Sequence, residues 1–209
     1  MYIKITERCN MSCAHCGHSA THKGKDMSKK VWKAALKLAN DYGEAISIGG
    51  GEPTIHPKFN EFLMDAISAS QDEGEPIWLA TNGSITKTAL LLSKLASCGV
   101  IACTLSQDSY HDPIDERVVE AFEIYDDRNR QENDFRSIRN VDGKEIVAGR
   151  CTWGKQGCIC ESLFVEPSGT IRACGCADAP VFGTVFDPKI PEGWDFVNCH
   201  KEQTQCCVA

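Results

Sequence analysis

Apolar segments of strand length alternate with amphipathic segments of helix length over the first two-thirds of the chain, and this alternation limits the possible folds. The strand-like segments cover residues 2–6, 45–48, 77–80 and 100–105. The helix-like segments cover residues 28–41, 57–70, 86–97 and 114–125. Strands that are separated by helices pair in parallel through right-handed crossovers. The sequence therefore predicts an α/β fold built on a parallel sheet.

Unusual residues follow each of these strands. Three cysteines follow the first strand, Gly49-Gly50-Gly51-Glu52-Pro53 the second, Thr81-Asn82-Gly83 the third and Ser106-Gln107-Asp108 the fourth. The carboxyl ends of parallel strands meet at one edge of a sheet, where α/β enzymes build their active sites. We therefore expect one functional site at that edge.

The composition bounds the class of protein. A chain of 209 residues with 42% hydrophobic residues favours one globular domain with an appendage. The net charge of -7 argues against a general nucleic-acid coat. No apolar run approaches the ~20 residues of a membrane helix, and the amino terminus lacks a signal-peptide pattern. We therefore expect a cytoplasmic protein without a membrane partner.

The chain contains 13 cysteines, an odd number that cannot be paired completely in disulfides. In a reducing compartment such cysteines are more often metal ligands or catalytic groups. Cys98 and Cys103 fit small core positions. The other cysteines gather at the start of the chain and in the tail. We therefore expect an α/β domain over residues 1–150 and a cysteine-rich extension over residues 151–209.

The first group of cysteines has the spacing Cys9-x3-Cys13-x2-Cys16. A structural zinc site would need a fourth ligand, which a nearby histidine could supply: His15, His18 or His22. Three thiolates could instead hold a [4Fe–4S] cluster and leave one iron open for a substrate or cofactor. The spacing alone leaves both possibilities open.

This cysteine motif, followed by Gly50-Gly51-Glu52-Pro53, resembles the radical S-adenosylmethionine (radical SAM) superfamily over about residues 2–125. The resemblance implies a partial (β/α)6 barrel in which Cys9, Cys13 and Cys16 hold a [4Fe–4S] cluster. The open iron of that cluster would bind SAM, and an external electron donor such as flavodoxin or ferredoxin would reduce it. Cleavage of SAM would then give a 5′-deoxyadenosyl radical, which abstracts a hydrogen atom from the substrate.

The resemblance also implies which residues contact SAM. The Gly50-Gly51-Glu52-Pro53 segment would receive its ammonium group, and His15 would lie near its adenine. The residues after the third and fourth strands would make further contacts, although plain turns would explain them too. The complete set is His15, Gly50, Gly51, Glu52, Pro53, Thr81, Asn82, Ser106 and Asp108.

The tail contains a predicted hairpin with strands at residues 163–166 and 170–173 and a turn at 167–169. Cys158, ten residues, Gly169, four residues and Cys174 resemble the SPASM or twitch extensions of radical SAM enzymes. The resemblance implies one auxiliary [4Fe–4S] cluster, with further ligands among the later cysteines. Our expected ligands are Cys158, Cys174, Cys176, Cys199 and Cys206, with Cys207 as an alternative. A zinc site, or a disulfide such as Cys151 with Cys160, is the rival interpretation.

Three further residues are candidates for catalysis. Tyr110 could quench a radical, and His111 could donate or accept a proton beside it. A turn before a helix that begins near Pro113 would explain both residues equally well. Arg150 precedes the cysteine-rich tail and is our third candidate. Lysines 23–33 could contact phosphates around the site or form a solvated face. A second hairpin, with strands at residues 135–141 and 145–148, is also predicted.

We expect an enzyme of isomerase or oxidoreductase type that takes hydrogen from an amino-acid-like carbon. The substrate would be a peptide or an amino-acid-decorated nucleobase, such as a modified thymine in viral DNA. The first strand starts at Tyr2, so we expect no leader-binding domain before it. The alternative is a non-catalytic zinc or iron–sulfur module.

Overall fold

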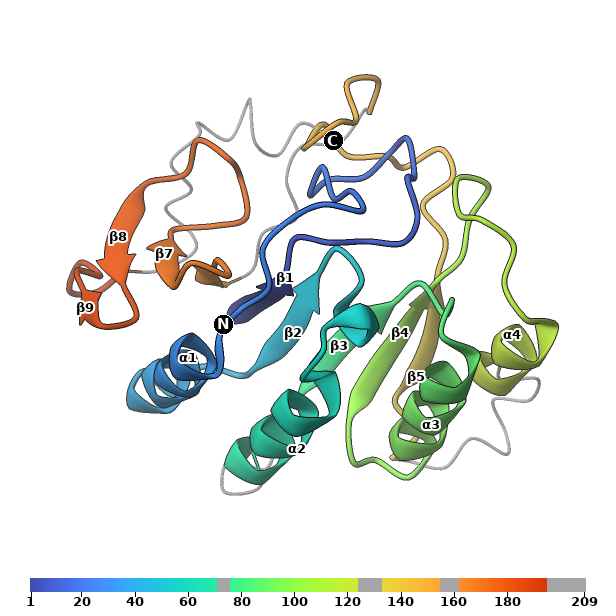
Figure 1. The fold of residues 1–209 in the computed structure, drawn as a ribbon, viewed down its shortest axis with the longest axis horizontal. Coiled ribbons are helices and arrows are strands. Elements are labelled where there is room, and N and C mark those ends of the chain that lie inside the picture. Colours follow the sequence, from blue (N-terminus) through green and yellow to red (C-terminus); the bar gives the residue numbers. More distant parts are fainter. Residues whose placement is uncertain (71–75, 124–132, 155–161, 195–209) are drawn as a thin grey trace.

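The computed structural model describes residues 1–70, 76–123, 133–154 and 162–194. They form a sheet of nine strands in the order β5-β4-β3-β2-β1-β6-β7-β8-β9. The first five strands are β1 (Tyr2–Thr6), β2 (Ser47–Gly50), β3 (Trp78–Thr81), β4 (Ala102–Ser106) and β5 (Arg136–Arg139). The tail adds β6 (Phe164–Val165), β7 (Thr170–Arg172), β8 (Val181–Thr184) and β9 (Asp187–Pro188). The helices lie along one face of β1–β5 (Figure 1).

The strands β1 to β5 pair in parallel with their neighbours, and β6 pairs in parallel with the free edge of β1. The strands β7 to β9 continue the sheet in antiparallel pairing. This arrangement confirms the predicted α/β fold with a mostly parallel sheet. The cysteine-containing tail therefore extends the same sheet, and the predicted domain boundary at residue 150 remains a prediction.

The main core lies between the sheet and its helices α1 (Lys29–Asp41), α2 (Phe59–Ser70), α3 (Thr86–Ser97) and α4 (Glu116–Phe122). Ile3, Ile5 and Ile48 point into it and have 0% exposure. Opposite them, Trp32 of α1 stacks on Phe62 of α2 with 4.6 Å between ring centroids. Since successive side chains of a strand alternate between faces, the other residues of β1 face away from the helices.

Two of the predicted elements are displaced. The second strand covers Ser47–Gly50, so Gly49 and Gly50 belong to the strand rather than to the turn after it. The fourth helix begins at Glu116, because the side chain of Asp115 caps it by accepting a hydrogen bond from the Arg117 amide. The described part of that helix ends at Phe122.

The hairpin predicted for residues 135–148 is wrong. The strand β5 pairs in parallel with the edge of β4, and residues 145–148 contain only an isolated bridge. The local turn at Asp142-Gly143 does exist. The free edge of β4 takes β5 into the parallel sheet, so the turn leads into an irregular segment. The tail hairpin is confirmed: β6 and β7 pair around Gly169, which has φ of 87°.

Candidate functional site

The loop that carries Cys9, Cys13 and Cys16 follows β1 at the carboxyl edge of the sheet (Figure 1). The Cys9 amide donates a hydrogen bond to the Thr21 carbonyl at 2.7 Å, which closes the base of this cluster loop, residues 9–21. The Cys16 amide donates to the Cys13 carbonyl at 3.2 Å. Cys9 is buried, whereas Cys13 and Cys16 are half-buried. The loop thus presents three free thiols from a folded frame.

The three thiols influence one another electrostatically. Burial, together with charges on Cys9 and Cys16, raises the pKa of Cys13 to about 11. Burial also raises the pKa of Cys9. Three thiolates so close together repel one another unless a positively charged metal centre binds them. The donor set therefore fits a metal centre.

The three thiols do not converge on one point among the described residues. The potential ligand atoms that lie within 4.8 Å of one another there belong to His15, Asp108 and His111. A single zinc ion needs ligands that converge on one point, whereas the irons of a cube accept thiolates at separate corners. The three cysteines remain the predicted ligands of the cluster.

The glycine run lies directly against β1 and the cluster loop. A Cβ atom on Gly50 would lie 2.4 Å from the Thr6 carbonyl oxygen, and one on Gly51 would lie 2.1 Å from the Arg8 carbonyl oxygen. Gly50 also has φ of 153°. These contacts explain why glycine is needed here without any ligand. The predicted contact of Gly50, Gly51 and Pro53 with SAM remains a prediction.

Glu52 has 1% exposure, and its carboxylate is occupied by the protein. One oxygen accepts hydrogen bonds from the Thr54 amide and from the Thr54 and Thr81 hydroxyls at 2.6–3.1 Å. The other accepts from the Asn82 amide at 2.7 Å. Burial raises the pKa of this carboxyl, and the hydrogen bonds oppose the rise. Through these hydrogen bonds Glu52 ties the 3-10 helix η1 (Pro53–Ile55) to the end of β3. Its predicted contact with the SAM ammonium group remains a prediction.

Asn82 extends this connection to the cluster loop. Its side-chain amide lies 3.7 Å from the Cys9 sulfur and donates to the Asn10 side-chain oxygen at 3.1 Å. The end of β3 therefore contacts a predicted cluster ligand directly. The sequence analysis placed Thr81 and Asn82 near the site but gave them no role in supporting the cysteine loop.

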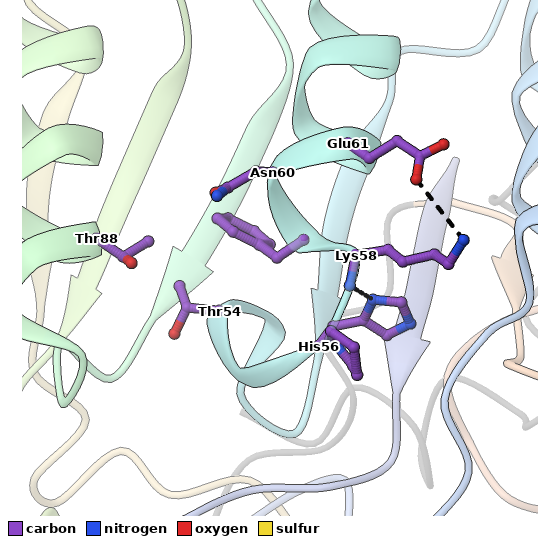
Figure 2. Close-up of a pocket in the computed structure, with 8 residues that line it drawn as sticks. Thr54, His56, Lys58, Asn60, Glu61 and Thr88 are labelled. Atoms are coloured by element: carbon purple, nitrogen blue, oxygen red, sulfur yellow. Dashed lines mark hydrogen bonds and ion pairs between the residues drawn. The ribbon is translucent and has the colours of Figure 1, made fainter.

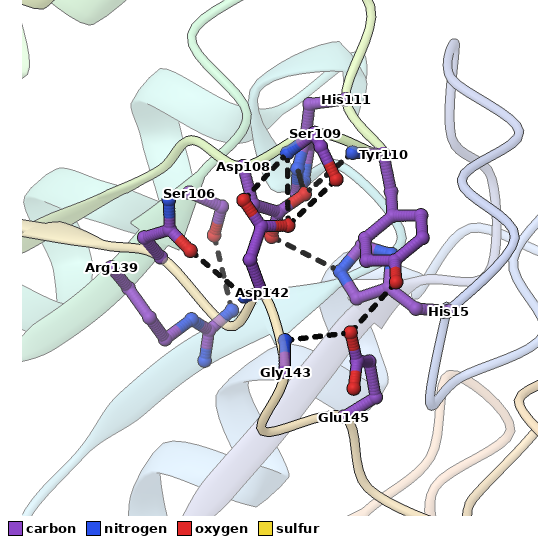
Figure 3. A network of polar contacts seen from close by, with 11 residues as sticks. His15, Ser106, Asp108, Ser109, Tyr110, His111, Arg139, Asp142, Gly143 and Glu145 are labelled. Atoms are coloured by element: carbon purple, nitrogen blue, oxygen red, sulfur yellow. Dashed lines mark hydrogen bonds and ion pairs between the residues drawn. The ribbon is translucent and has the colours of Figure 1, made fainter. Parts of the chain in front are cut away.

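Asp108, after β4, lies between two histidines from different loops (Figure 3). Its carboxylate oxygens lie 3.2 Å from His15 Nε2 and 2.7 Å from His111 Nδ1. Burial lowers the pKa of His15, and the Asp108 carboxylate opposes the change. Because His15 precedes Cys16, this contact joins the fourth strand to the cluster loop. His15, Asp108 and His111 are therefore brought together as predicted for one site.

Tyr110 joins the same network through its ring and its hydroxyl (Figure 3). The ring stacks on His15 with 4.6 Å between centroids. The hydroxyl donates to Glu145 Oε1 at 2.7 Å, and this hydrogen bond raises the pKa of Tyr110. Glu145 also accepts a hydrogen bond from the Gly143 amide at 2.9 Å. Sequence reasoning missed Glu145, because nothing nearby in the chain marks it.

The sequence did not single out Arg139 as a site residue. It ends β5, and its guanidinium donates to the Ser106 hydroxyl at 3.0 Å (Figure 3). Ser106 ends β4, so the pair lies at the carboxyl edge of two adjacent strands. A signal was present in the sequence, since Arg139 lies within a predicted strand at residues 135–141, but the hairpin prediction did not place that strand beside β4.

Arg150 lies against the back of the cluster loop. Its amide donates to the Cys16 carbonyl at 3.1 Å, and its guanidinium donates to the Ala20 carbonyl. Gly149 has φ of 57°, and a Cβ atom there would lie 2.4–2.5 Å from the carbonyl oxygens of Gly17 and Cys16. We call residues 149–151 the strap. Its contacts make Arg150 a support of the cluster loop.

The predicted auxiliary ligands are only partly described. Cys174 is buried and Cys176 is half-buried, and both follow β7. Cys158, Cys199 and Cys206 lie outside the described residues, as do Cys160 and Cys207. The auxiliary cluster remains a prediction.

A hollow on the helical side, beside α2, is separate from these loops (Figure 2). Its polar groups bind one another: the His56 ring accepts from the Lys58 amide at 3.0 Å, and Lys58 lies 3.8 Å from Glu61. Glu61 also pairs with Lys29. Lys29 thus belongs to an ion-paired helical surface, which supports the solvated-face interpretation of the lysine cluster.

The fold and site define a class of protein with a parallel α/β sheet and a three-thiol metal loop at its carboxyl edge. Residues 3–141 match the Radical SAM superfamily, and the chain belongs to that family. Membership implies a [4Fe–4S] cluster and SAM as cofactors. No helix among the described residues is both long and apolar enough to cross a membrane.

Two relatives and one solved structure show the extent of the similarity. The tungsten-containing aldehyde ferredoxin oxidoreductase cofactor-modifying protein of Pyrococcus furiosus is 34% identical over 113 residues, 52% of this chain and 30% of that protein. YydG of Bacillus subtilis, named for peptide biosynthesis, is 32% identical over 118 residues, 53% of this chain and 36% of that protein. The chain thus spans about a third of the length of these curated relatives.

The solved structure is BtrN in complex with AdoMet and 2-DOIA, with a TM-score of 0.59 and 15% identity. The match covers 88% of this chain and 77% of BtrN. At this identity the likeness shows the fold.

Proposed function

We propose that the protein is a radical SAM enzyme that abstracts a hydrogen atom from an amino-acid-like carbon of its substrate. The observation that carries this proposal is the meeting of three free thiols with the loops after β2, β3 and β4 at one edge of the sheet. When bound, the cluster and SAM supply the 5′-deoxyadenosyl radical. The roles of the protein residues follow from their positions.

Cys9, Cys13 and Cys16 hold the cluster in this proposal. The backbone of Gly50, Gly51 and Pro53 receives the SAM ammonium group. Glu52, Thr81 and Asn82 fix that backbone against the cluster loop through the hydrogen bonds that they share. Their main role in this proposal is to hold the glycine backbone in position, and direct contact with SAM is secondary.

The loops after β4 and β5 complete the SAM site. His15 lies beside the adenine, and Asp108 and His111 hold its ring in place. Arg139, held by Ser106, offers a planar guanidinium, which fits the carboxylate of an amino acid such as the methionine part of SAM.

Tyr110 and His111 are the proposed proton-handling or radical-quenching groups. The Tyr110 hydroxyl already donates to the Glu145 carboxylate, which can accept its proton. Arg150 acts as a positioning residue and not as a catalytic one. Cys158, Cys174, Cys176, Cys199 and Cys206 are the proposed ligands of one auxiliary [4Fe–4S] cluster, and flavodoxin or ferredoxin is the proposed electron donor.

A peptide is the substrate class that the relatives favour, because YydG is named for peptide biosynthesis. The reaction type, an isomerisation or an oxidation, stays a prediction. The cytoplasmic location is also still a prediction. An amino-acid-decorated nucleobase contains the same kind of carbon. It is the alternative substrate class that the experiment compares with a peptide.

The test follows deuterium from the substrate. A peptide pool and DNA are prepared from cells grown in deuterated medium, and each is offered to the reduced, reconstituted protein with SAM. We expect deuterium in 5′-deoxyadenosine from the peptide pool only, with none from the Cys13→Ala variant. Transfer from DNA only would assign the nucleobase class. Transfer from neither would contradict the proposed carbon.

A further inference from the structure

The sheet face opposite the helices bears an aromatic wall and a lysine, Lys4, that has no side-chain partner among the described residues. Tyr2 and Lys4 point to this face, because they alternate with Ile3 and Ile5 of the core. The neighbouring strands supply Phe164, opposite Tyr2, and Gly49, opposite Lys4. Gly49 has no side chain, so nothing from β2 covers Lys4 at that position. Both Tyr2 and Lys4 remain half-buried.

Three rings form the wall. Tyr2 stacks on Phe164 with 5.0 Å between centroids and an 11° angle between planes. The ring of His18, from the cluster loop, lies 5.8 Å from Tyr2 and 6.0 Å from Phe164. The Tyr2 hydroxyl accepts a hydrogen bond from the Gly50 amide at 3.1 Å. The wall therefore joins β1, β6, the glycine run and the cluster loop.

The Tyr2 hydroxyl is uncharged at physiological pH. Burial raises the pKa of Tyr2 to about 12, so its hydroxyl keeps its proton. The Tyr2 and Phe164 rings therefore offer a stacking surface without charge.

The Lys4 side chain forms no hydrogen bond or ion pair with any residue in the described ranges. The two carboxylates whose charges act on Lys4, Glu7 and Glu166, bind other residues. Glu7 accepts a hydrogen bond from the Lys25 amide at 2.9 Å, and Glu166 binds Arg172 at 2.7 Å. Burial lowers the pKa of Lys4, and these two carboxylates oppose the change. Lysine is rarely buried without a partner.

The Lys4 side chain lies on the same side of the sheet as the proposed cluster. Tyr2, on the same face as Lys4, reaches the cluster loop and the glycine run, because its hydroxyl lies 3.4 Å from His18 Nε2 and 3.1 Å from the Gly50 amide. A group bound at Lys4 would therefore lie beside the proposed cluster, on the side of the sheet that the helices leave open.

We propose that Lys4 binds an anionic group of the substrate, a carboxylate or a phosphate, while the Tyr2, His18 and Phe164 rings cover the adjoining apolar or planar part. This inference rests on the proposed function, since it assigns the substrate of the same site. It defines the substrate as an anion, although the protein itself has a net charge of -7. A cation held at a fixed position in an acidic protein selects an anion by position rather than by overall attraction.

The test compares matched charged and neutral probes by calorimetry on the reconstituted protein with SAM. One pair is N-acetylglutamate and N-acetylglutamine, and the other is thymidine 5′-monophosphate and thymidine. We expect the anionic member of one pair to bind at least about tenfold more tightly, as a charge-assisted hydrogen bond allows. The pair that shows the preference identifies the anion as carboxylate or phosphate.

Lys4→Gln should abolish this preference, and Lys4→Arg should retain it. Lys23→Gln removes one positive charge from an exposed loop residue and should change nothing. Absence of a preference in the unmodified protein, or a preference that survives Lys4→Gln, overturns the inference. Iron content and circular dichroism show whether each variant is folded.

SAM cleavage in the absence of substrate shows whether Lys4 binds a carboxylate of the substrate or the carboxylate of SAM itself. We expect the KM for SAM to stay within twofold in Lys4→Gln. A tenfold rise in that KM without any effect on the probe pairs would assign Lys4 to the SAM carboxylate and overturn the inference. If the unmodified protein makes no 5′-deoxyadenosine, the proposed function fails, while the probe pairs still report on Lys4.

Discussion

Asp108 is the residue on which two loops of the site depend. Its two oxygens bind His15 and His111, and it has 9% exposure. An amide at this position has one oxygen and cannot accept on both sides. The substitution would leave one histidine without its partner.

We therefore expect Asp108→Asn to lower kcat/KM for SAM cleavage about 10- to 100-fold, the cost of a lost hydrogen bond to a charged group. Most of the effect should appear in the KM for SAM, with iron content unchanged, since Asp108 orients His15 and is not one of the proposed cluster ligands. Asp112→Asn, at an exposed neighbouring position, is the control. A variant with unchanged KM would show that Asp108 does not position the ligand.

At the same scale, the sequence predicted some contacts better than others. The Cys9-x3-Cys13-x2-Cys16 spacing places all three thiols on one loop, and their role as cluster ligands stays a prediction. The contact between His15 and Asp108 joins residues that are far apart in the chain, so only the fold reveals it. Whether the Glu52 carboxylate faces a ligand or the protein depends on donors from Thr54 nearby and from the end of β3.

The strap is the element that most clearly supports the cluster loop from outside it. Gly149 has a positive φ and lies against two carbonyl oxygens of the cluster loop, whereas Gly143 has φ of 77° and nothing within 4 Å of its Cβ position. Both glycines therefore have a positive φ, but only Gly149 lies in close contact with other residues. They form a matched pair for mutation.

Gly149→Ala should lower the free energy of unfolding by about 2–4 kcal/mol, because it adds a clash to the backbone strain. Gly143→Ala should cost about 1 kcal/mol from strain alone. Chemical denaturation measures both, and iron retention after gel filtration should fall in Gly149→Ala only. Equal effects of the two substitutions would mean that the strap does not constrain the loop.

Elements defined by local signals were predicted well. The tail hairpin forms where Gly169 provides its turn, and α1 begins after Ser28, whose hydroxyl accepts from the Val31 amide at 3.3 Å. The pairing of β5 with β4 and of β6 with β1 depends on strands distant in the chain. The Asp142-Gly143 turn was recognised, but no local pattern shows that its preceding strand joins the parallel sheet.

At the scale of the whole molecule, one continuous sheet connects the cluster loop to the cysteine-containing tail. The strand β1 lies between β2, which carries the glycine run, and β6, which begins the tail hairpin. A ligand on the open face of β1 therefore touches both halves of the chain. This continuity explains how a substrate could lie between the proposed SAM site and the proposed auxiliary cluster.

The most direct test of the central claim measures 5′-deoxyadenosine formed from SAM by the anaerobically reconstituted, dithionite-reduced protein. We compare the unmodified chain with Cys9→Ala, Cys13→Ala and Cys16→Ala, and use Cys98→Ala, at an exposed position, as the control. In the proposed site each of the three thiolates supplies one of the protein bonds to the cluster, so each loss should abolish the product. Cys98→Ala should retain full activity. Product formation that persists in any of the three loop variants would contradict the account.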